Sequence, residues 1–422
     1  MSWAHLLLSL IAGISILLML IRPWNIPEVY WIAGGVLLLF LLHLVSGQLV
    51  VRATLKAVDV CLFLVGMMLL SELARAHGVF DWLASVAVSR AKGSCSRLFM
   101  LVYAAGTLVT VFMSNDATAV VLTPAILTAV RRAKAQPLPY LFACALIANA
   151  ASFLLPISNP ANLVVFHNQM PPLGHWLLSF GLPCLISIVS TFLVLRWLFR
   201  RELSQCIRLE AELQPLSGDG RLVLGGLAVT ILVLLIVSSL GMDLGLPTCL
   251  VALAVTAAAS IKTQTNPLRL ARDISWETLA LVAGLFVMVD SIESIGAMRY
   301  TQQWLAWAEN LNITAGSFVA GFGVGLANNL VNNLPLGLIA GSTLQAAHAK
   351  GLIANAVLIG VDLGPNLSIT GSLATILWLI ALRKEKLDVS FWSFIKVGAV
   401  AMPVALLASL GGAILMQAFF PT

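Results

Sequence analysis

Charged residues are scarce in this 422-residue sequence: they make up 10% of it, whereas soluble domains carry about a quarter. Hydrophobic residues make up 60%, and several apolar runs approach the roughly 20 residues that cross a hydrocarbon core. This balance excludes an ordinary soluble domain and predicts a polytopic membrane protein. The 24 Lys and Arg residues form no continuous basic stripe, so no nucleic acid partner is expected.

The sequence also lacks the motifs of several enzyme classes. It has no GxxxxGK[ST] run for ATP hydrolysis, no HExxH zinc site and no GxSxG nucleophile turn. Its six Cys show no CxxC spacing and its six His are isolated, so neither a metal site nor a cofactor is expected. An intramembrane hydrolase would need a nucleophile–base pair that the sequence does not offer. We therefore expect a secondary transporter and no enzyme.

Two short polar runs interrupt apolar segments at matching places in the two halves. The first, at 114–116, lies within the segment 97–132, and the second, at 332–333, lies within 313–349. Polar groups deep in apolar segments are costly in lipid, so they are kept where they face protein, water or a ligand. A matched pair of such breaks indicates a midplane binding site in a transporter built from repeats. The residues are Ser114, Asn115, Asp116, Asn332 and Asn333.

The two halves of the chain repeat each other. Five residue pairs lie at a constant offset of 218, and three pairs in the later segments lie at 213. Several matches at one offset, in the same order of elements, indicate an internal duplication of 1–200 as 222–422, joined by a polar linker at 201–221. The pairs are Ser114 with Asn332, Asn115 with Asn333, Gly66 with Gly284, Glu72 with Asp290, Gly78 with Gly296, Asn149 with Asp362, Asn159 with Ser372 and Asn162 with Thr375.

Charge predicts the topology. Both flanks of 97–132 are basic, and cytoplasmic loops collect Lys and Arg, so this segment reads as a re-entrant hairpin with cytoplasmic ends, and 313–349 as its counterpart. The segments 137–167 and 351–382 are broken spans. The predicted fold is an all-α polytopic membrane protein with ten transmembrane helices plus two re-entrant hairpins in two inverted-topology repeats, and the linker 201–221 is cytoplasmic. The Lys and Arg residues outside this rule are Arg52, Lys56, Arg299 and Lys350.

The hairpin tips and the loops of the broken spans are candidates for a small-solute site. Non-helical backbone at membrane depth needs internal partners, and side-chain amides and hydroxyls supply donors and acceptors. Half-helix N-termini direct partial positive charge inward, while unwound carbonyls offer negative oxygen. Plainer alternatives stay open: Asn332 and Asn333 only cap broken helices, and the Pro and Gly residues of the loops only kink the spans.

Two carboxylates, Asp116 and Asp362, lie inside these breaks. An apolar environment disfavours the charged form of a carboxylate, so either residue could take up a coupling proton and release it when substrate arrives. Glu72 and Asp290 lie near span ends, where a structural role explains them equally well.

The run from Phe112 to Pro124 resembles the hairpin of the ion transporter superfamily, which includes arsenical pumps, sodium/proton antiporters and dicarboxylate transporters. The runs 355–366 and 371–378 are similar to the second broken span of bacterial arsenite efflux pumps. This resemblance implies efflux of trivalent arsenite and antimonite, as neutral hydroxides in exchange for protons, across the cytoplasmic (inner) membrane of a bacterium. By position, the resemblance also implies a substrate site with Asp362 beside it. Together with Ser114, the site consists of Asn115, Asp116, Asn159, Asn162, Asn332, Asn333, Gly371 and Ser372.

The resemblance also implies partners. Some members of the superfamily bind a soluble arsenical ATPase, and many are homodimers. One departure matters: relatives tend to carry an acid where this chain has Asn149, which leaves proton coupling to Asp116 or Asp362.

Two other functions stay open, a sodium/proton antiporter of the same superfamily and a passive metalloid channel. A neutral hydroxide such as As(OH)₃ resembles a small polyol, which Asn and Ser side chains suit. No fixed cation lies at the tips, which disfavours a dicarboxylate but not sodium.

Overall fold

The structure, a computed structural model, describes residues 3–166, 170–204, 215–264 and 266–420. Within these ranges the chain is helical and has no strand, so the predicted all-α class is confirmed. Residues 205–214 of the expected linker, and residue 167 at the end of an expected broken span, lie outside the described residues.

The helices divide between the two halves of the chain. Those of the first half are α1 (Trp3–Ile21), η1 (Pro23–Asn25), α2 (Glu28–Leu41), α3 (Gly47–Ala76), α4 (Val79–Ala91), α5 (Cys95–Phe112), α6 (Asn115–Ala117), η2 (Thr118–Leu122), α7 (Thr123–Arg132), α8 (Leu138–Ala150), η3 (Pro156–Ser158), α9 (Pro160–Val165), α10 (Leu173–Leu198) and α11 (Arg200–Leu203). Those of the second half are α12 (Gly218–Ser239), α13 (Gly245–Thr263), α14 (Pro267–Arg272), α15 (Trp276–Ser294), α16 (Arg299–Glu309), α17 (Ile313–Val331), α18 (Asn333–Ala347), α19 (Leu352–Leu363), η4 (Gly364–Leu367), η5 (Ile369–Gly371), α20 (Leu373–Lys384) and α21 (Phe391–Phe419).

Seven of the described helices are long and apolar enough to cross a membrane, or eight if the bent pair α15 and α16 counts as one span. The chain is therefore a multi-pass membrane protein. Length alone does not give the ten expected crossings, because α2 is short and because α8 and α19 stop partway through their apolar segments. Pro156 and Pro160 follow α8, and Pro365 follows α19. Proline cannot donate a backbone hydrogen bond, so Pro365 accounts for the end of α19, whereas α8 already ends at Ala150, six residues before Pro156.

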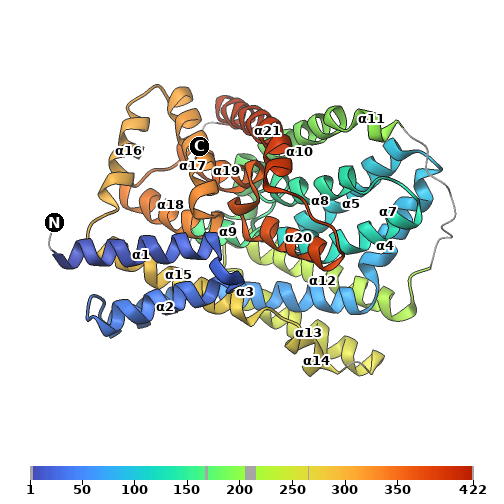
Figure 1. The fold of residues 1–422 in the computed structure, drawn as a ribbon, viewed down its shortest axis with the longest axis horizontal. Coiled ribbons are helices and arrows are strands. Elements are labelled where there is room, and N and C mark those ends of the chain that lie inside the picture. Colours follow the sequence, from blue (N-terminus) through green and yellow to red (C-terminus); the bar gives the residue numbers. More distant parts are fainter. Residues whose placement is uncertain (1–2, 167–169, 205–214, 265, 421–422) are drawn as a thin grey trace.

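The helices form two layers (Figure 1). In the lower layer of the figure, α3 packs against α13 and α15, while α2 packs against α1 and α15. In the upper layer α10 runs along α21, α5 packs against α8, and α17 packs against α19. The layers meet where α9 packs against α3 and α18 packs against α15. All the interrupted segments belong to the upper layer.

Two glycines let helices of the lower layer approach closely. A Cβ on Gly66 of α3 would lie 2.8 Å from the backbone oxygen of Thr248 on α13. A Cβ on Gly284 of α15 would lie 2.6 Å from the side chain of Ile32 on α2. These two glycines form one of the sequence pairs at offset 218. Each allows a long lower-layer helix to pack closely against a helix from the other half of the chain.

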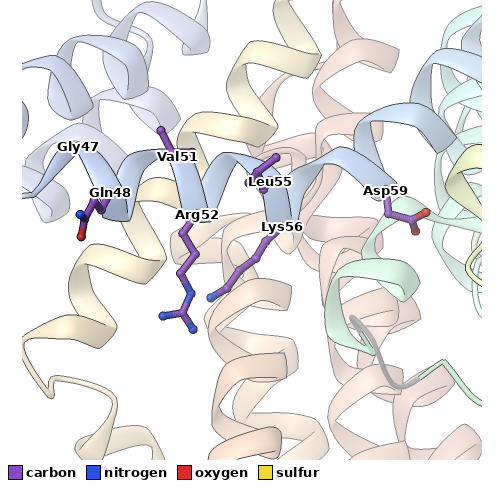
Figure 2. A pocket seen from close by; sticks show the side chains of 7 residues that line it. All are labelled: Gly47, Gln48, Val51, Arg52, Leu55, Lys56 and Asp59. Carbon is purple, nitrogen blue, oxygen red and sulfur yellow. The ribbon is translucent and has the colours of Figure 1, made fainter.

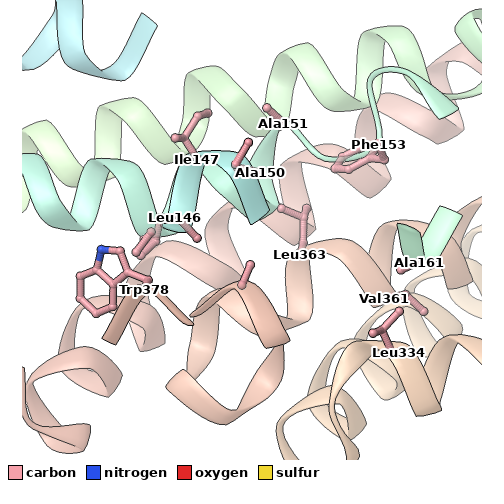
Figure 3. Close-up of a cluster of buried hydrophobic side chains, with 14 of the residues drawn as sticks. Leu146, Ile147, Ala150, Ala151, Phe153, Ala161, Leu334, Val361, Leu363 and Trp378 are labelled. Carbon is pink, nitrogen blue, oxygen red and sulfur yellow. The ribbon is translucent and has the colours of Figure 1, made fainter. Parts of the chain in front are cut away.

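Apolar side chains enclose the broken spans (Figure 3). Leu146 and Ala150 of α8 lie near Leu363 at the end of α19, and Trp378 of α20 lies beside Leu146. The indole nitrogen of Trp378 donates a hydrogen bond of 3.1 Å to the carbonyl oxygen of Leu141, so even this ring has its polar atom paired. The unwound loops are thus surrounded by protein and not by lipid.

Gly66→Ala is expected to destabilise the protein. The added methyl group collides with a backbone carbonyl that cannot move out of the way, and overpacking of this kind costs about 1–3 kcal/mol. The thermal unfolding midpoint in detergent should therefore fall. Gly34→Ala on α2 is the control, because a Cβ there meets nothing within 4 Å. Equal midpoints for the two variants would contradict the packing role of Gly66.

Candidate functional site

The first hairpin tip is held by its own side chains. After α5 ends, Ser114 is extended, and its hydroxyl accepts a hydrogen bond of 3.1 Å from the backbone nitrogen of Ala117. The side-chain oxygen of Asn115 accepts one of 2.9 Å from the backbone nitrogen of Asp116. The Asp116 carboxylate accepts no hydrogen bond and forms no ion pair with any described residue, and it is partly exposed. It is thus left open to a ligand or a proton.

The chain turns back immediately after this tip. The hydroxyls of Thr110 on α5 and Thr118 on η2 lie 2.8 Å apart, and Thr118 also donates to the carbonyl of Gly106 at 3.4 Å. These contacts place η2 alongside α5, so that the tip lies at the end of a helical hairpin.

The second tip is strained and tied to the neighbouring loop. Asn332 has φ 80° and ψ 151°, which a residue with a Cβ rarely adopts and which costs about 1–3 kcal/mol. Its amide nitrogen donates 3.2 Å to the carbonyl oxygen of Thr370. Ser368 in the same loop donates 2.6 Å to the side-chain oxygen of Asn329. These bonds join α17 to the loop between α19 and α20, which compensates for the strain.

Asn162 closes the unwound loop between α8 and α9. Its amide nitrogen lies 2.9, 3.3 and 3.3 Å from the carbonyl oxygens of Ser152, Leu155 and Pro156. In the other loop, the hydroxyl of Thr375 donates 2.8 Å to the carbonyl of Ile369. In both loops, therefore, a side chain of the following helix satisfies unwound backbone.

The two broken spans are bonded to each other across the halves of the chain. Asn159 donates 2.8 Å to Asp362, and Ser372 donates 3.4 Å to Asn149. At the sequence offset of 213, Asn159 corresponds to Ser372 and Asn149 corresponds to Asp362. The bond from Asn159 to Asp362 in one direction therefore corresponds to the bond from Ser372 to Asn149 in the other. Asn149 also donates 3.0 Å to the side chain of Asn366.

Residues of both tips line one narrow cavity of about 10 Å³, the space of roughly one water molecule. Its polar lining is Asn115, Asp116, Asn159, Thr278 and Asn333. The other residues lining it are Leu64, Pro160, Leu334, Leu373 and Ala374. The two tips and the first broken span therefore meet at a single point, opposite Thr278 on α15.

A wider cavity of about 100 Å³ continues from this point toward the end of α3 and the start of α15. It shares Asp116 and Thr278 with the narrow cavity, and adds Ser114, Glu72 and Asp273. Glu72 and Asp273 both pair with Arg75, but among the described residues no Lys, Arg or His lines either cavity. The route is therefore acidic.

The opposite end of the site is sealed by α9 and α18, which pack against each other. Beyond that seal lies a separate, larger cavity, lined among others by Arg52, Lys56 and Lys350. Lys56 forms an ion pair of 2.8 Å with Asp290 and so joins α3 to α15. Figure 2 shows Arg52 and Lys56 extending from the same side of α3. Arg52, Lys56 and Lys350 are three of the four basic residues that the predicted topology places on the side of the membrane opposite the cytoplasm.

Four enclosed side-chain oxygens around the breaks have no hydrogen-bond partner. They belong to Asn162, Asn328, Asn333 and Asp362. In Asn162 and Asn328 the orientation of the amide is fixed, because the nitrogen faces two or three carbonyl oxygens and the oxygen must point away. Of these four residues only Asn333 lines a described cavity, so its oxygen is the one that can accept from a ligand that brings O–H groups.

The predicted site residues divide into two groups. Ser114, Asn115, Asp116, Asn159 and Asn333 line the cavities. The remaining candidates hold the backbone around them: Asn162 and Asn332 bind loop carbonyls, Ser372 caps α20, and Asp362 is bonded to Asn159, while a Cβ on Gly371 would lie 2.6 Å from Pro365.

Sequence reasoning missed several residues of this framework. Asn328 and Asn329 lie in the last turn of α17, four residues before Asn332 and Asn333, and this second pair of polar residues in an apolar segment could have revealed them. Asn366, which bonds to the other half, ends the run 355–366, but the sequence offered no reason to assign it a role. Thr278 carried no signal, because it is a single hydroxyl in an apolar helix.

Known proteins share this sequence pattern and fold. Residues 2–361 match the family described as citrate transporter (CitMHS). The chain is 25% identical over 378 residues to an arsenical pump membrane protein of Escherichia coli, covering 84% of this chain and 86% of that protein. It is 27% identical over 357 residues to an arsenical pump membrane protein of Yersinia enterocolitica, covering 81% and 82%. The crystal structure of the Alcanivorax borkumensis YdaH transporter has a similar fold, with a TM-score of 0.59 at 15% identity over 100% of this chain and 99% of that one.

Asn162→Ala is expected to destabilise the protein because three loop carbonyls lose their donor, and leaving buried polar groups unpaired costs about 1–3 kcal/mol. Thermal unfolding in detergent measures this. Asn310→Ala is the matched control, since its amide makes a similar bond of 2.9 Å to the Ala306 carbonyl but is exposed. If both variants unfold at the same temperature, Asn162 does not hold the loop.

Proposed function

The chain belongs to the citrate transporter (CitMHS) family, and on this premise we propose that it is a secondary transporter that exports trivalent arsenite and antimonite in exchange for protons. Family membership and the arsenical pump relatives make it a membrane transporter related to arsenic efflux. The substrate, its coupling to protons and the residues of the site are the proposal.

The observation that carries the proposal is the pair of adjoining cavities at the tips: Asn115, Asp116, Asn159 and Asn333 meet at the narrow one, and the wider one, of about 100 Å³, offers space for a small solute beside the unpaired Asp116 carboxylate. The amides can both donate to and accept from hydroxyl groups, which suits a small neutral trihydroxide. Citrate or a dicarboxylate would have to pass carboxylates on a route whose lining carries no cation, so it is a poor substrate for this site. The proposed substrate is therefore As(OH)₃ or Sb(OH)₃.

The wider cavity adds a feature suited to a metalloid. Met67 and Met68 of α3 line it on the way to Asp116. Thioethers are polarizable ligands that favour soft centres such as trivalent arsenic and antimony over sodium. This contact supports metalloid selectivity without a cysteine in the route.

The first loop favours protons over sodium as the coupling ion. In discontinuous spans, unwound carbonyl oxygens are the usual ligands of a transported sodium ion. Here the carbonyls of Ser152, Leu155 and Pro156 face the amide nitrogen of Asn162. A side-chain donor thus takes the place that a cation would need, and the candidates left for coupling are Asp116 and Asp362.

We extend the proposal to the membrane topology. Ten crossings and two re-entrant hairpins form two inverted repeats, 1–200 and 222–422, in the bacterial inner membrane, with the linker 201–221 in the cytoplasm. The exchanged bonds of Asn159 with Asp362 and of Ser372 with Asn149 support the repeat, as do Gly66 and Gly284.

With this orientation the described conformation is open to the cytoplasm. The acidic route from Asp116 leads to the end of α3 that carries Arg75, while the packing of α9 on α18 closes the other side. Export then requires the upper layer to move against α3 and α15, by an elevator or a rocking motion, until the tips face outward. A docked arsenical ATPase and a homodimer remain predictions.

Arsenite uptake into everted membrane vesicles with an acidic interior tests the function. The wild-type protein should accumulate arsenite against its gradient. Asp116→Asn removes the group that exchanges the proton, so uphill uptake should fall at least about tenfold, the effect expected from losing a proton-transfer group. Thr278→Val, which removes a hydroxyl from the same cavity without changing charge, is the control and should keep its dependence on the pH gradient.

The alternatives give different results in the same vesicles. A sodium/proton antiporter would show proton flux that depends on sodium and ignores arsenite. A passive channel would equilibrate arsenite but never concentrate it. Either result would overturn the proposed function.

A further inference from the structure

The two carboxylates in the breaks, Asp116 and Asp362, differ in exposure, in access to the cavities and in hydrogen bonding. Asp116 is partly exposed, lines both cavities and has no hydrogen-bond partner among the described residues. Asp362 is fully buried, lines neither cavity, and accepts a hydrogen bond of 2.8 Å from Asn159 on one oxygen. Only the first of them has an open path to water in this conformation.

The surroundings of Asp362 suit a carboxylic acid better than a carboxylate. Its Oδ2 has no donor, and no described Lys or Arg forms an ion pair with it. The hydroxyl of Ser152 donates its proton to the Asn149 carbonyl oxygen at 2.7 Å, so that proton is already engaged. An unpaired carboxylate charge in so enclosed a place is costly, whereas a neutral carboxylic acid avoids that cost.

The other half of the chain has a neutral group in the corresponding place. Asn149 is the counterpart of Asp362 and accepts the corresponding bond from Ser372. Its side chain carries an amide of nearly the same shape as a protonated carboxyl group. The position that Asn149 and Asp362 occupy in the two halves therefore accommodates a neutral planar group whose one oxygen accepts a hydrogen bond.

We propose that Asp362 stays protonated throughout the cycle as a positioning residue that fastens Asn159 and the two broken spans, and that Asp116 alone carries the coupling proton. This inference rests on the proposed function for its transport readout, but its protonation readout does not. The sequence left proton coupling to either Asp116 or Asp362, and this inference assigns it to Asp116.

The proton balance follows from this division. Facing outward, the Asp116 carboxylate takes one proton from water and forms one O–H bond. Facing the cytoplasm, that bond breaks, the proton leaves through the acidic cavity, and As(OH)₃ enters beside the restored carboxylate. One proton thus moves inward for each neutral trihydroxide that moves outward.

Other titratable groups lie near each carboxylate. The cavity around Asp116 also carries Glu72 and Asp273, both paired with Arg75. The thiol of Cys184 on α10 faces Asp362. Variants at Asp116 and Asp362 must therefore be compared with Glu72→Gln, which changes the charge of the route without touching either break.

Transport by Asp362→Asn gives the first test. Because the amide replaces a neutral acid, uphill arsenite uptake should stay within about threefold of wild type, with an unchanged pH profile and pH-gradient dependence. Asp116→Asn should lose both. Asp362→Ala, which leaves Asn159 without an acceptor, should raise the KM for arsenite more than it lowers the maximal rate. A pH profile that shifts or flattens in Asp362→Asn would overturn the inference.

Infrared spectroscopy of the purified protein near neutral pH gives the second test and needs no transport. The carbonyl band of a protonated carboxylic acid should be present in wild type and Glu72→Gln and absent in Asp362→Asn. An unchanged spectrum in Asp362→Asn would refute permanent protonation. If wild type shows the band but does not move arsenite, the proposed function fails while the assignment of Asp362 stands.

Discussion

The structure depends on one constraint: backbone that unwinds inside an apolar layer must find its hydrogen-bond partners within the protein. Lipid supplies none, so each break in a span needs side chains to satisfy its carbonyl and amide groups. Asn162, Asn332 and Thr375 do this for the two loops and the second tip. The polar residues that seemed out of place in the sequence are there first of all for this reason.

The same constraint distinguishes the side chains that hold the unwound backbone from those that line the cavity. Once loop carbonyls engage the amide nitrogens of Asn162 and Asn328, the oxygens of these amides must face the other way. Unpaired oxygens therefore accumulate around the breaks, while the cavity itself is formed by Asn115, Asp116 and Asn333. A neutral solute with several hydroxyl groups matches such surroundings, and an anion does not.

The sequence predicted the breaks well because their causes are local. Proline after α8 and α19, and polar residues in an apolar run, mark an interruption wherever the segment packs. The pair Gly66 and Gly284 was also visible, because the two residues lie at the same offset of 218 as four other pairs. The direction of each amide could not be predicted, since it depends on partners far away in the chain: Asn149 meets Asn366, and Asn159 meets Asp362. For the same reason the sequence could not tell that Asp362 is enclosed and Asp116 open, or that Thr278 faces the tips.

The central claim is that one proton, carried by Asp116, is exchanged for each neutral trihydroxide. The steady-state arsenite ratio across vesicle membranes, measured against the imposed pH difference with the membrane potential clamped at zero, tests it most directly. An exchange of one for one predicts a ratio that changes about tenfold for each pH unit and does not respond to sodium. A ratio that stays at one, or that follows the sodium gradient instead, would contradict the account.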